Sequence, residues 1–227
     1  MLKIFIGYDP RESVAYHTLS NSILRNASVP VSITPLYLPN LRAIFNRPSD
    51  EQQSNSFSYS RFLIPYLCNY QGHALYLDCD MLMRGDVANV FEEYAETDMA
   101  VSVVKHRYKS KVSVKYLGNV QHNYPRKNWS SFVLWNCSHT SNKVVNPRFV
   151  ETADPATLHR FLWLNDNEIG EISVKWNWLV GEYDEPPSDI MNVHWTIGGP
   201  YFNEYANADF ADEWFEENRL MTLCDQL

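Results

Sequence analysis

The stretch ALYLDCDML, residues 74–82, decides how the fold is interpreted. Its first four residues are apolar, which predicts a strand buried on both faces, as in a parallel sheet. Two acids, Asp78 and Asp80, follow directly. Side chains alternate along an extended chain, so both carboxylates are expected on one side and Cys79 on the other. Two like charges in a poorly hydrated place repel each other, so the pattern predicts a cation between them.

The position of these acids favours a divalent metal ion. Ligands of α/β proteins bind at the carboxyl ends of the strands, where Asp78 and Asp80 are expected. Carboxylate oxygens suit Mg²⁺ or Mn²⁺, which bridge to phosphate oxygens of a ligand. A second motif, HWTIGGP at residues 194–200, follows another predicted strand. We expect His194 to complete an Asp, Asp, His ligand set; the alternative is a buried histidine of the core.

The first forty residues predict a β-α-β unit. An apolar strand over residues 2–8 precedes Asp9, which is placed to cap a helix that has Pro10 in its first turn. Apolar side chains at Ala15, Leu19 and Ile23 continue one helical face. A second strand is expected over residues 31–38. This order is typical of a doubly wound α/β sheet.

The remaining pattern extends the same architecture. Helices are expected at 57–70, 86–94 and 155–164, and strands at 73–77, 99–104, 132–136 and 190–195. The fold predicted is therefore α/β, with a Rossmann-like, mixed but mainly parallel sheet flanked by helices. With 227 residues and no Gly/Ser linker, we expect a single domain over residues 1–227.

Charge is distributed unevenly along the chain. The net charge of −8 argues against a nucleic-acid partner. Between residues 99 and 150 there is no Asp or Glu, and nine basic residues stand there: Lys105, Arg107, Lys109, Lys111, Lys115, Arg126, Lys127, Lys143 and Arg148. Two interpretations stay open, a solvated loop and a docking face for an anionic substrate. A peripheral membrane contact through residues 105–127 belongs to the second interpretation.

Cysteines and hydropathy indicate the compartment. The four cysteines are scattered without a C-x-x-C pair, so reduced thiols are expected rather than a disulfide framework or a zinc site. The N-terminal apolar run is too short for a signal peptide, and no run reaches the length of a membrane span. We therefore expect a cytoplasmic protein. No glycine-rich phosphate loop, G-x-S-x-G elbow or H-E-x-x-H motif is present, so the chemistries of those motifs are not indicated.

Several segments, taken in order, resemble the GT-A glycosyltransferases of family 8, the glycogenin and lipopolysaccharide galactosyltransferase group. They are IFIGYD at 4–9, SRFLIP at 60–65, LYLDCD at 75–80, FVLWN at 132–136 and the His194 motif with its glycines. The matches run over nearly the whole chain. Each segment is weakly diagnostic alone, whereas their order together is fairly specific.

The resemblance implies a hexosyltransferase that moves a sugar from a nucleotide-diphosphate donor, expected to be a UDP-sugar, to a glycan, lipid or other acceptor with retention of anomeric configuration. It implies that Asp78, Asp80 and His194 hold Mn²⁺ or Mg²⁺. The residues expected to contact the donor are Gly7, Tyr8, Asp9, Arg11, Arg61, Asp78, Gly198 and Gly199. A cation and an arginine against the leaving diphosphate would stabilise the charge that develops there.

One departure from the family pattern affects the expected site, and one catalytic position has to be assigned. The family's lysine after the glycines is absent, so a basic side chain from residues 105–127 would have to replace it. The residue beneath the reacting sugar is expected within the NDNE segment at 165–168. We predict Asp166 for this catalytic position and Glu168 as the second candidate; the alternative is an ordinary helix cap.

Two other functions remain open from the sequence. A sugar nucleotidyltransferase also combines an α/β sheet with metal-binding carboxylates, although its glycine-rich loop is poorly matched by GYDPR at 7–11. A non-catalytic module that binds glycans or anionic polymers would use the basic segment as its contact surface. Three metal ligands held together argue against such a module.

Overall fold

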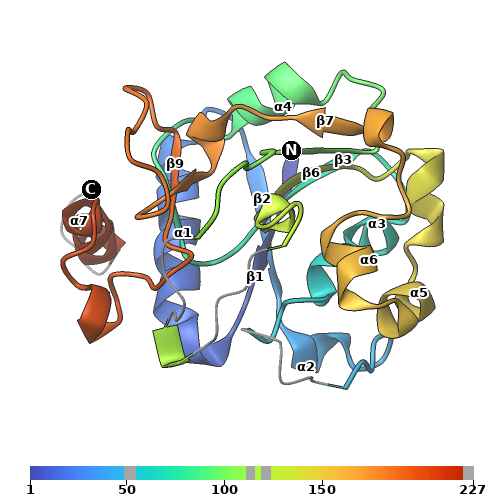
Figure 1. Cartoon of the computed structure of the whole chain (residues 1–227), viewed down its shortest axis with the longest axis horizontal. Helices are drawn as coiled ribbons and strands as arrows, with labels where there is room; N and C mark the ends of the chain where they lie inside the picture. Colours follow the sequence, from blue (N-terminus) through green and yellow to red (C-terminus); the bar gives the residue numbers. More distant parts are fainter. Residues whose placement is uncertain (49–54, 111–115, 119–123, 222–227) are drawn as a thin grey trace.

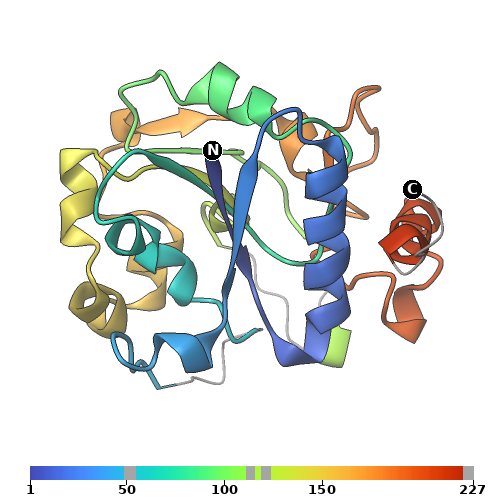
Figure 2. The same ribbon diagram turned by 180° about the vertical axis from the view of Figure 1, so that it is seen from behind.

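The computed structural model describes residues 1–48, 55–110, 116–118 and 124–221. It begins with the expected β-α-β unit: β1 (Leu2–Gly7), α1 (Ser13–Asn26) and β2 (Val31–Leu36), with β1 and β2 parallel. Asp9 caps the short 3₁₀ helix Pro10–Glu12 by accepting the Arg11 amide. This unit places the end of β1 and the start of α1 at one edge of the sheet (Figures 1 and 2).

The fold is α/β, as predicted. Its central sheet is mixed, and its strands have the order β2-β1-β3-β6-β5-β7. Its further strands are β3 (His73–Leu77), β5 (Val101–Val103), β6 (Phe132–Asn136) and β7 (Ile169–Glu171). β1–β2, β1–β3 and β5–β7 are parallel, whereas β6 is antiparallel to both of its neighbours. The direction of β6 could not be predicted, because an apolar run has the same pattern in either direction.

A smaller sheet joins distant parts of the chain. It has the order β4-β9-β8, formed by β4 (Met81–Met83), β9 (Asn192–His194) and β8 (Trp178–Leu179). Met81 of β4 pairs with His194 of β9 in antiparallel register. Because β4 follows Asp80 directly, this pairing brings His194 beside the acidic pair that ends β3.

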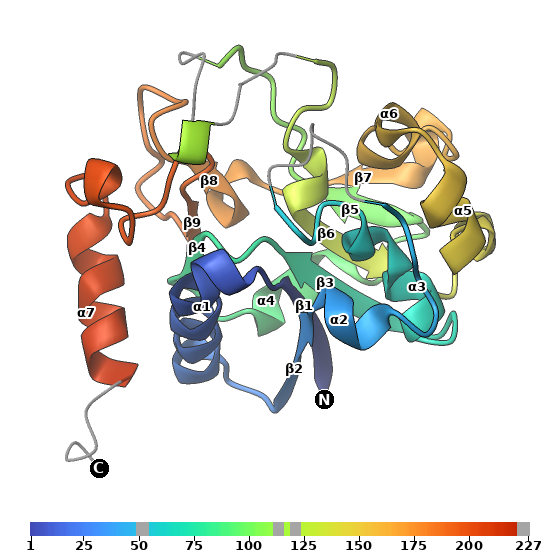
Figure 3. The ribbon, with the colours of Figure 1, turned by 90° about the horizontal axis from the view of Figure 1, so that it is seen from below.

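The helices flank the sheet. They are α2 (Leu38–Leu41), α3 (Ile64–Leu67), α4 (Ala88–Tyr94), α5 (Pro147–Thr152), α6 (Pro155–His159) and α7 (Ala211–Met221). Short 3₁₀ helices occupy Ser60–Leu63, Tyr116–Gly118, Trp129–Ser131, Thr140–Val144, Asp166–Glu168, Val174–Trp176 and Asn203–Tyr205. Figure 3 shows α1 and α7 side by side on one flank, with α5 and α6 on the other.

Two predicted helices are shorter than expected. The helix predicted over 57–70 is a turn, a 3₁₀ helix and then α3, which has Pro65 in its first turn. Proline lacks the amide that a helix interior needs, so α3 begins next to it instead of continuing through it. The helix predicted over 155–164 ends at His159, and Phe161 adopts a left-handed backbone (φ 53°) that stops the helical path.

The core is apolar and continuous beneath the carboxyl ends of the strands. Its largest fully buried side chains include Trp135, Trp176, Tyr76 and Phe62. A smaller cluster around Trp178, Trp195 and Trp214 packs the second sheet against the C-terminal helix α7. Packing on both sides therefore fixes the short segment between β3 and β4. Among the described residues, no helix has the length and hydropathy required to cross a membrane.

Candidate active site

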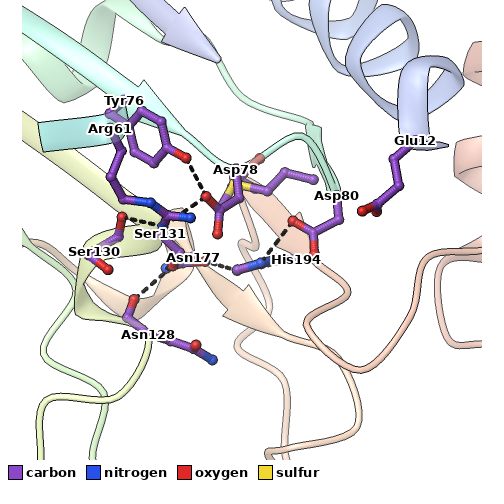
Figure 4. Close-up of polar contacts among 12 residues, drawn as sticks. Glu12, Arg61, Tyr76, Asp78, Asp80, Asn128, Ser130, Ser131, Asn177 and His194 are labelled. Carbon is purple, nitrogen blue, oxygen red and sulfur yellow. Dashed lines mark hydrogen bonds and ion pairs between the residues drawn. The ribbon is translucent and has the colours of Figure 1, made fainter. Parts of the chain in front are cut away.

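Three potential metal ligands converge where the two sheets meet. One ligand atom from each of Asp78, Asp80 and His194 lies within 4.8 Å of the other two. Asp78 and Asp80 occupy the bend between β3 and β4, and His194 is the last residue of β9. Figure 4 shows the three side chains pointing toward one another. Residues more than a hundred positions apart thus share one small polar site, as the sequence predicts.

Asp78 is the most strongly held member of the group. Its Oδ1 accepts a hydrogen bond from the Tyr76 hydroxyl at 2.5 Å and pairs with the Arg61 guanidinium at 2.9 Å. Arg61 also donates to the carbonyl oxygen of Ser130 at 2.9 Å. Burial raises the pKa of Asp78, and the charge of Arg61 opposes that rise. The structure therefore places Arg61 against the Asp78 carboxylate, one of the three potential metal ligands, in a buried ion pair.

His194 and Asp80 meet through Nε2 and Oδ1, which lie 3.1 Å apart. His194 Nδ1 lies 2.8 Å from Asn177 Oδ1, so the ring donates its Nδ1 proton to that amide oxygen. In the neutral ring, the Nε2 lone pair then faces Asp80 Oδ1 at 3.1 Å. Asp80 Oδ1 is buried and finds no hydrogen-bond donor among the described residues. Facing acceptors of this kind fit a divalent cation between them, with two carboxylates and an imidazole as ligands.

A buried polar network supports His194 from behind. Asn177 donates from Nδ2 to Ser131 Oγ at 2.9 Å and to His106 Nε2 at 3.0 Å. On its other side, His106 Nδ1 lies 2.7 Å from the Tyr183 hydroxyl. Burial lowers the pKa of His106 to about 3, which keeps its ring neutral. Sequence reasoning missed this network, because its members come from segments whose meeting depends on the tertiary fold.

The residues predicted to contact the donor at the end of β1 lie at the same edge of the sheet. A side chain at Gly7 would place its Cβ 2.3 Å from the Phe57 ring. Tyr8 is half-buried and makes edge contacts with the rings of Tyr16 and Tyr37. Only glycine, which has no Cβ, fits at position 7. The next residue, Tyr8, belongs to a cluster of three tyrosine rings.

Asp9 and Arg11 pair with each other at this edge. Asp9 is buried, accepts the backbone and side chain of Arg11, and also accepts the Ser56 amide and hydroxyl. Burial tends to raise the pKa of Asp9, but these hydrogen bonds outweigh it and lower the pKa to about 2. The Asp9 carboxylate is thus an ionised helix cap whose acceptor positions are occupied by the protein itself.

Two tyrosines cover the double glycine that follows His194. A Cβ at Gly198 would lie 2.2 Å from the Tyr205 ring, and a Cβ at Gly199 would lie 2.2 Å from the Tyr201 ring. The Tyr201 hydroxyl donates to the buried Glu12 carboxylate at 2.5 Å. Aromatic rings therefore occupy the space that a side chain at either glycine would need.

The structure separates Glu168 from the three ligands. β3 and β6 are antiparallel, so Phe132 pairs with Leu77 at the Asp78 end of the sheet and Asn136 pairs with His73 at the opposite end. Glu168 accepts a hydrogen bond from Ser141, which follows β6 at that opposite end, and forms a capping box with Asn165. The geometry therefore gives Glu168 the cap that the sequence left open as the alternative.

Asp166, the first catalytic candidate, is exposed and forms an ion pair with Arg126. The Arg126 guanidinium carbon lies 5.2 Å from the centre of the Trp129 ring, in the segment that leads to Ser131. The carboxylate of Asp166 is thus directed toward the basic segment. It is not a member of the group formed by Asp78, Asp80 and His194.

The described basic residues between positions 99 and 150 lie in different surroundings. Lys127 is buried, with its Nζ 5.7 Å from the centre of the Tyr108 ring, whereas Lys143 belongs to the opposite end of the sheet. Lys105 and Arg107 line a pocket of about 310 Å³ with His106, Glu171 and Tyr183. Lys111 and Lys115, predicted as part of a docking face, lie outside the described residues.

The arrangement of strands and helices is that of solved glycosyltransferases. The bifunctional glycosyltransferase WbbM matches over 96% of this chain with a TM-score of 0.67 and 15% identity; this chain spans about half, 49%, of WbbM. The galactosyltransferase LgtC, solved with donor and acceptor sugar analogues, matches over 99% of this chain and 98% of its own, with a TM-score of 0.63 and 11% identity. GlyE of Streptococcus pneumoniae matches at 0.62 and 13% over 96% of this chain and 60% of its own. The chain has the GT-A glycosyltransferase fold.

One curated protein shows the family of the chain. Protein CDI of Arabidopsis thaliana is 43% identical over 221 residues, which cover 95% of this chain and 85% of that protein. No family model matches the sequence. The chain belongs to the same protein family as Protein CDI.

Proposed function

We propose that the protein is a metal-dependent glycosyltransferase that takes its sugar from a nucleotide-diphosphate donor, with a UDP-sugar as the first candidate. The observation that carries the proposal is the pair formed by His194 Nε2 and the buried Asp80 Oδ1, 3.1 Å apart, with Asp78 beside them and no hydrogen-bond donor for that oxygen among the described residues. Such a pair has little purpose in a protein core, where a buried acceptor without a donor costs about 1–3 kcal/mol. The likeness in fold to LgtC, a family 8 enzyme, supports the same reaction class.

Asp78, Asp80 and His194 would hold Mn²⁺ or Mg²⁺ by two carboxylate oxygens and Nε2. When bound, the cation would supply positive charge to the donor's diphosphate and stabilise the leaving group. Arg61 compensates the charge of Asp78 in its buried position, and Tyr76 orients the same carboxylate. These two residues oppose protonation of this carboxylate and hold it in place, so that cation binding does not require the site to reorganise.

The donor would lie along the carboxyl ends of β1 and β3. Tyr8 and the turn after Gly7 are proposed to contact the base, and the backbone at Gly198 and Gly199 to border the diphosphate. Asp166 remains the proposed residue near the reacting sugar. Transfer with retention to a glycan or lipid-linked acceptor, within a single catalytic domain, completes the proposal.

A ligand panel tests this proposal. Melting temperatures of metal-free protein are measured with UDP-, GDP- and ADP-sugars, each with and without Mn²⁺, because a ligand that binds the native state raises the melting temperature by mass action. We expect one UDP-sugar to raise the melting temperature only when Mn²⁺ is present. Transfer of radiolabelled sugar, or slow donor hydrolysis, then identifies the reaction.

Three outcomes would contradict the proposal. Release of pyrophosphate from a nucleoside triphosphate would identify a nucleotidyltransferase instead. Binding of glycans or anionic polymers without any metal-linked effect would identify a binding module. Equal stabilisation by every nucleotide sugar in the absence of metal would remove the role of Asp78, Asp80 and His194.

A further inference from the structure

Asn177 lies between the two sheets and has no exposed surface. Its amide oxygen accepts from His194 Nδ1 at 2.8 Å. Its amide nitrogen donates to Ser131 Oγ at 2.9 Å and to His106 Nε2 at 3.0 Å. The side chain thus uses its acceptor on the smaller sheet and its donors on groups beside the central sheet (Figure 4).

The orientation of this amide is determined by its neighbours. The Ser131 hydroxyl has a single proton, which it donates to the carbonyl oxygen of Asn128 at 2.7 Å. Ser131 Oγ can therefore only accept from Asn177, which requires the NH₂ group of Asn177 on that side and its oxygen toward His194. His106 is consistent with this direction, because its neutral ring accepts at Nε2 and donates from Nδ1 to the Tyr183 hydroxyl.

The Asn177 amide also links the segment of Asp78 to that of His194 through hydrogen bonds. The carbonyl oxygen of Ser131 accepts the backbone amide of Asp78 at 3.0 Å, while the hydroxyl of Ser131 accepts from Asn177. Asn177 thereby joins the strand end that carries Asp78 to the strand that carries His194. This buried side chain is therefore a second link between the two strands, beside the pairing of Met81 with His194.

We propose that Asn177 is a positioning residue for the metal site: it fixes His194 as the Nδ1–H tautomer, directs the Nε2 lone pair toward Asp80, and sets the distance from His194 to Asp78. The inference rests on the proposed metal role of His194. A partner behind a metal-binding histidine fixes both its tautomer and its ring orientation, and loss of such a partner costs about 10–100-fold in metal affinity.

Two measurements test this inference. Long-range ¹H–¹⁵N spectra of the imidazole rings of metal-free protein report directly which nitrogen of His194 carries the proton, with the signals assigned from a His194→Gln sample. Titration of free Mn²⁺ by electron paramagnetic resonance gives the metal affinity. The first readout needs neither metal nor activity.

Three variants separate positioning from general stability. Asn177→Leu removes every hydrogen bond, and we expect a 10–100-fold loss of Mn²⁺ affinity together with exchange between the His194 tautomers. Asn177→Asp keeps an acceptor for Nδ1–H, so we expect it to retain the tautomer and to lose less affinity than Asn177→Leu. The matched control is Asn142→Leu, which removes a fully buried amide that donates to the carbonyl oxygens of Ala100 and Asn136 at the far end of the sheet.

The outcomes are distinguishable. An Nε2–H tautomer of His194 in the wild-type protein overturns the inference, whether or not Mn²⁺ binds. Equal Mn²⁺ affinities of Asn177→Leu and Asn142→Leu overturn it as well, while leaving the glycosyltransferase proposal intact. If wild-type protein binds no Mn²⁺, the proposed function fails; the spectra then still decide whether Asn177 sets the tautomer. Should Asn177→Leu fail to fold, the wild-type and Asn177→Asp spectra carry the test.

Discussion

Acidic side chains at the two ends of the central sheet differ in the hydrogen-bond donors around them. At the far end, Glu168 is surrounded by donors: the Ser141 hydroxyl and both the amide and the side chain of Asn165. At the other end, Asp80 Oδ1 lies 3.1 Å from His194 Nε2 and has no hydrogen-bond donor among the described residues. Both acids follow or precede a short strand in sequence, so position alone does not distinguish them. Their hydrogen-bond partners distinguish them, and the acid whose buried oxygen has no donor is the one that we propose as a cation ligand.

Asp9 shows that the distinction is one of partners and not of location. It lies at the same edge of the sheet as Asp80, yet its carboxylate is fully occupied by Arg11 and Ser56. Substitutions at these acids therefore test whether hydrogen-bond partners distinguish their roles.

The largest effect is expected for Asp80→Asn. Loss of a metal ligand removes transition-state stabilisation of several kcal/mol, so metal-dependent donor turnover should fall about 1,000-fold. Glu168→Gln, the matched substitution at the far end, should retain turnover within about threefold. Initial rates with saturating Mn²⁺ and the UDP-sugar identified by the ligand panel measure both. Comparable losses in the two variants would remove the distinction between the ends.

Asp78→Asn should give the largest loss of stability in metal-free protein. It leaves the Arg61 guanidinium, 5% exposed, without its counter-charge, and breaking a buried pair in this way costs about 3–5 kcal/mol. Urea denaturation of chelator-treated protein measures the change in the free energy of unfolding. A double variant, Asp78→Asn with Arg61→Met, serves as control and should recover part of the loss. A cost below about 1 kcal/mol for the single variant would show that Arg61 does not depend on Asp78.

Asp9→Ala should destabilise the fold by about 1–2 kcal/mol at neutral pH, because it removes a helix cap and its charged hydrogen bonds. The pKa of Asp9 is lowered from 3.8 to about 2 on folding, so its contribution is complete above pH 4 and is lost as the pH falls through 2. The difference in unfolding free energy between wild type and variant should shrink across that window. A difference that stays constant from pH 5 to pH 2 would contradict an ionised cap.

The smallest effect is expected for Glu168→Gln. The single acceptor oxygen of glutamine can still accept from the Asn165 amide, while its NH₂ group can donate to the Ser141 hydroxyl. The capping box therefore survives with weaker hydrogen bonds, at a cost of about 0.5 kcal/mol. The pKa of Glu168 is lowered by its hydrogen bonds with Ser141 and Asn165, so even this small cost should vanish in acid. Thermal unfolding at pH 7 and pH 3 measures it. A cost above 2 kcal/mol would mean that this carboxylate does more than cap a helix.

Much of this arrangement could be predicted from the sequence. The apolar run before Asp78 and the placement of Pro10 after Asp9 are local signals, and they gave the β-α-β unit and the acidic pair. The motif at His194 gave the third member of the group. The pairing of His194 with Met81 places the imidazole beside the two aspartates, as that prediction required.

The rest required the tertiary structure. The antiparallel direction of β6 places Glu168 at the far end of the sheet, and no periodicity encodes strand direction. Asn177 stands between two tryptophans in the sequence and carries no motif; its hydrogen bonds to His194 and Ser131 exist only once the two sheets meet. Hydrogen-bond saturation, which separates Asp9 from Asp80, is likewise a property of assembled neighbours.

The central claim is tested most directly by Mn²⁺-dependent stability of wild type and Asp80→Asn, both freed of metal beforehand. The free energy of unfolding of the wild type should rise with Mn²⁺ concentration, by about 2.7 kcal/mol at one hundred times the dissociation constant. Without metal, Asp80→Asn should be more stable than wild type by about 0.5–1 kcal/mol, because its amide can donate to His194 Nε2, and added Mn²⁺ should change it little. A wild type that is indifferent to Mn²⁺, or an Asp80→Asn variant stabilised by Mn²⁺ to the same extent, would contradict the account.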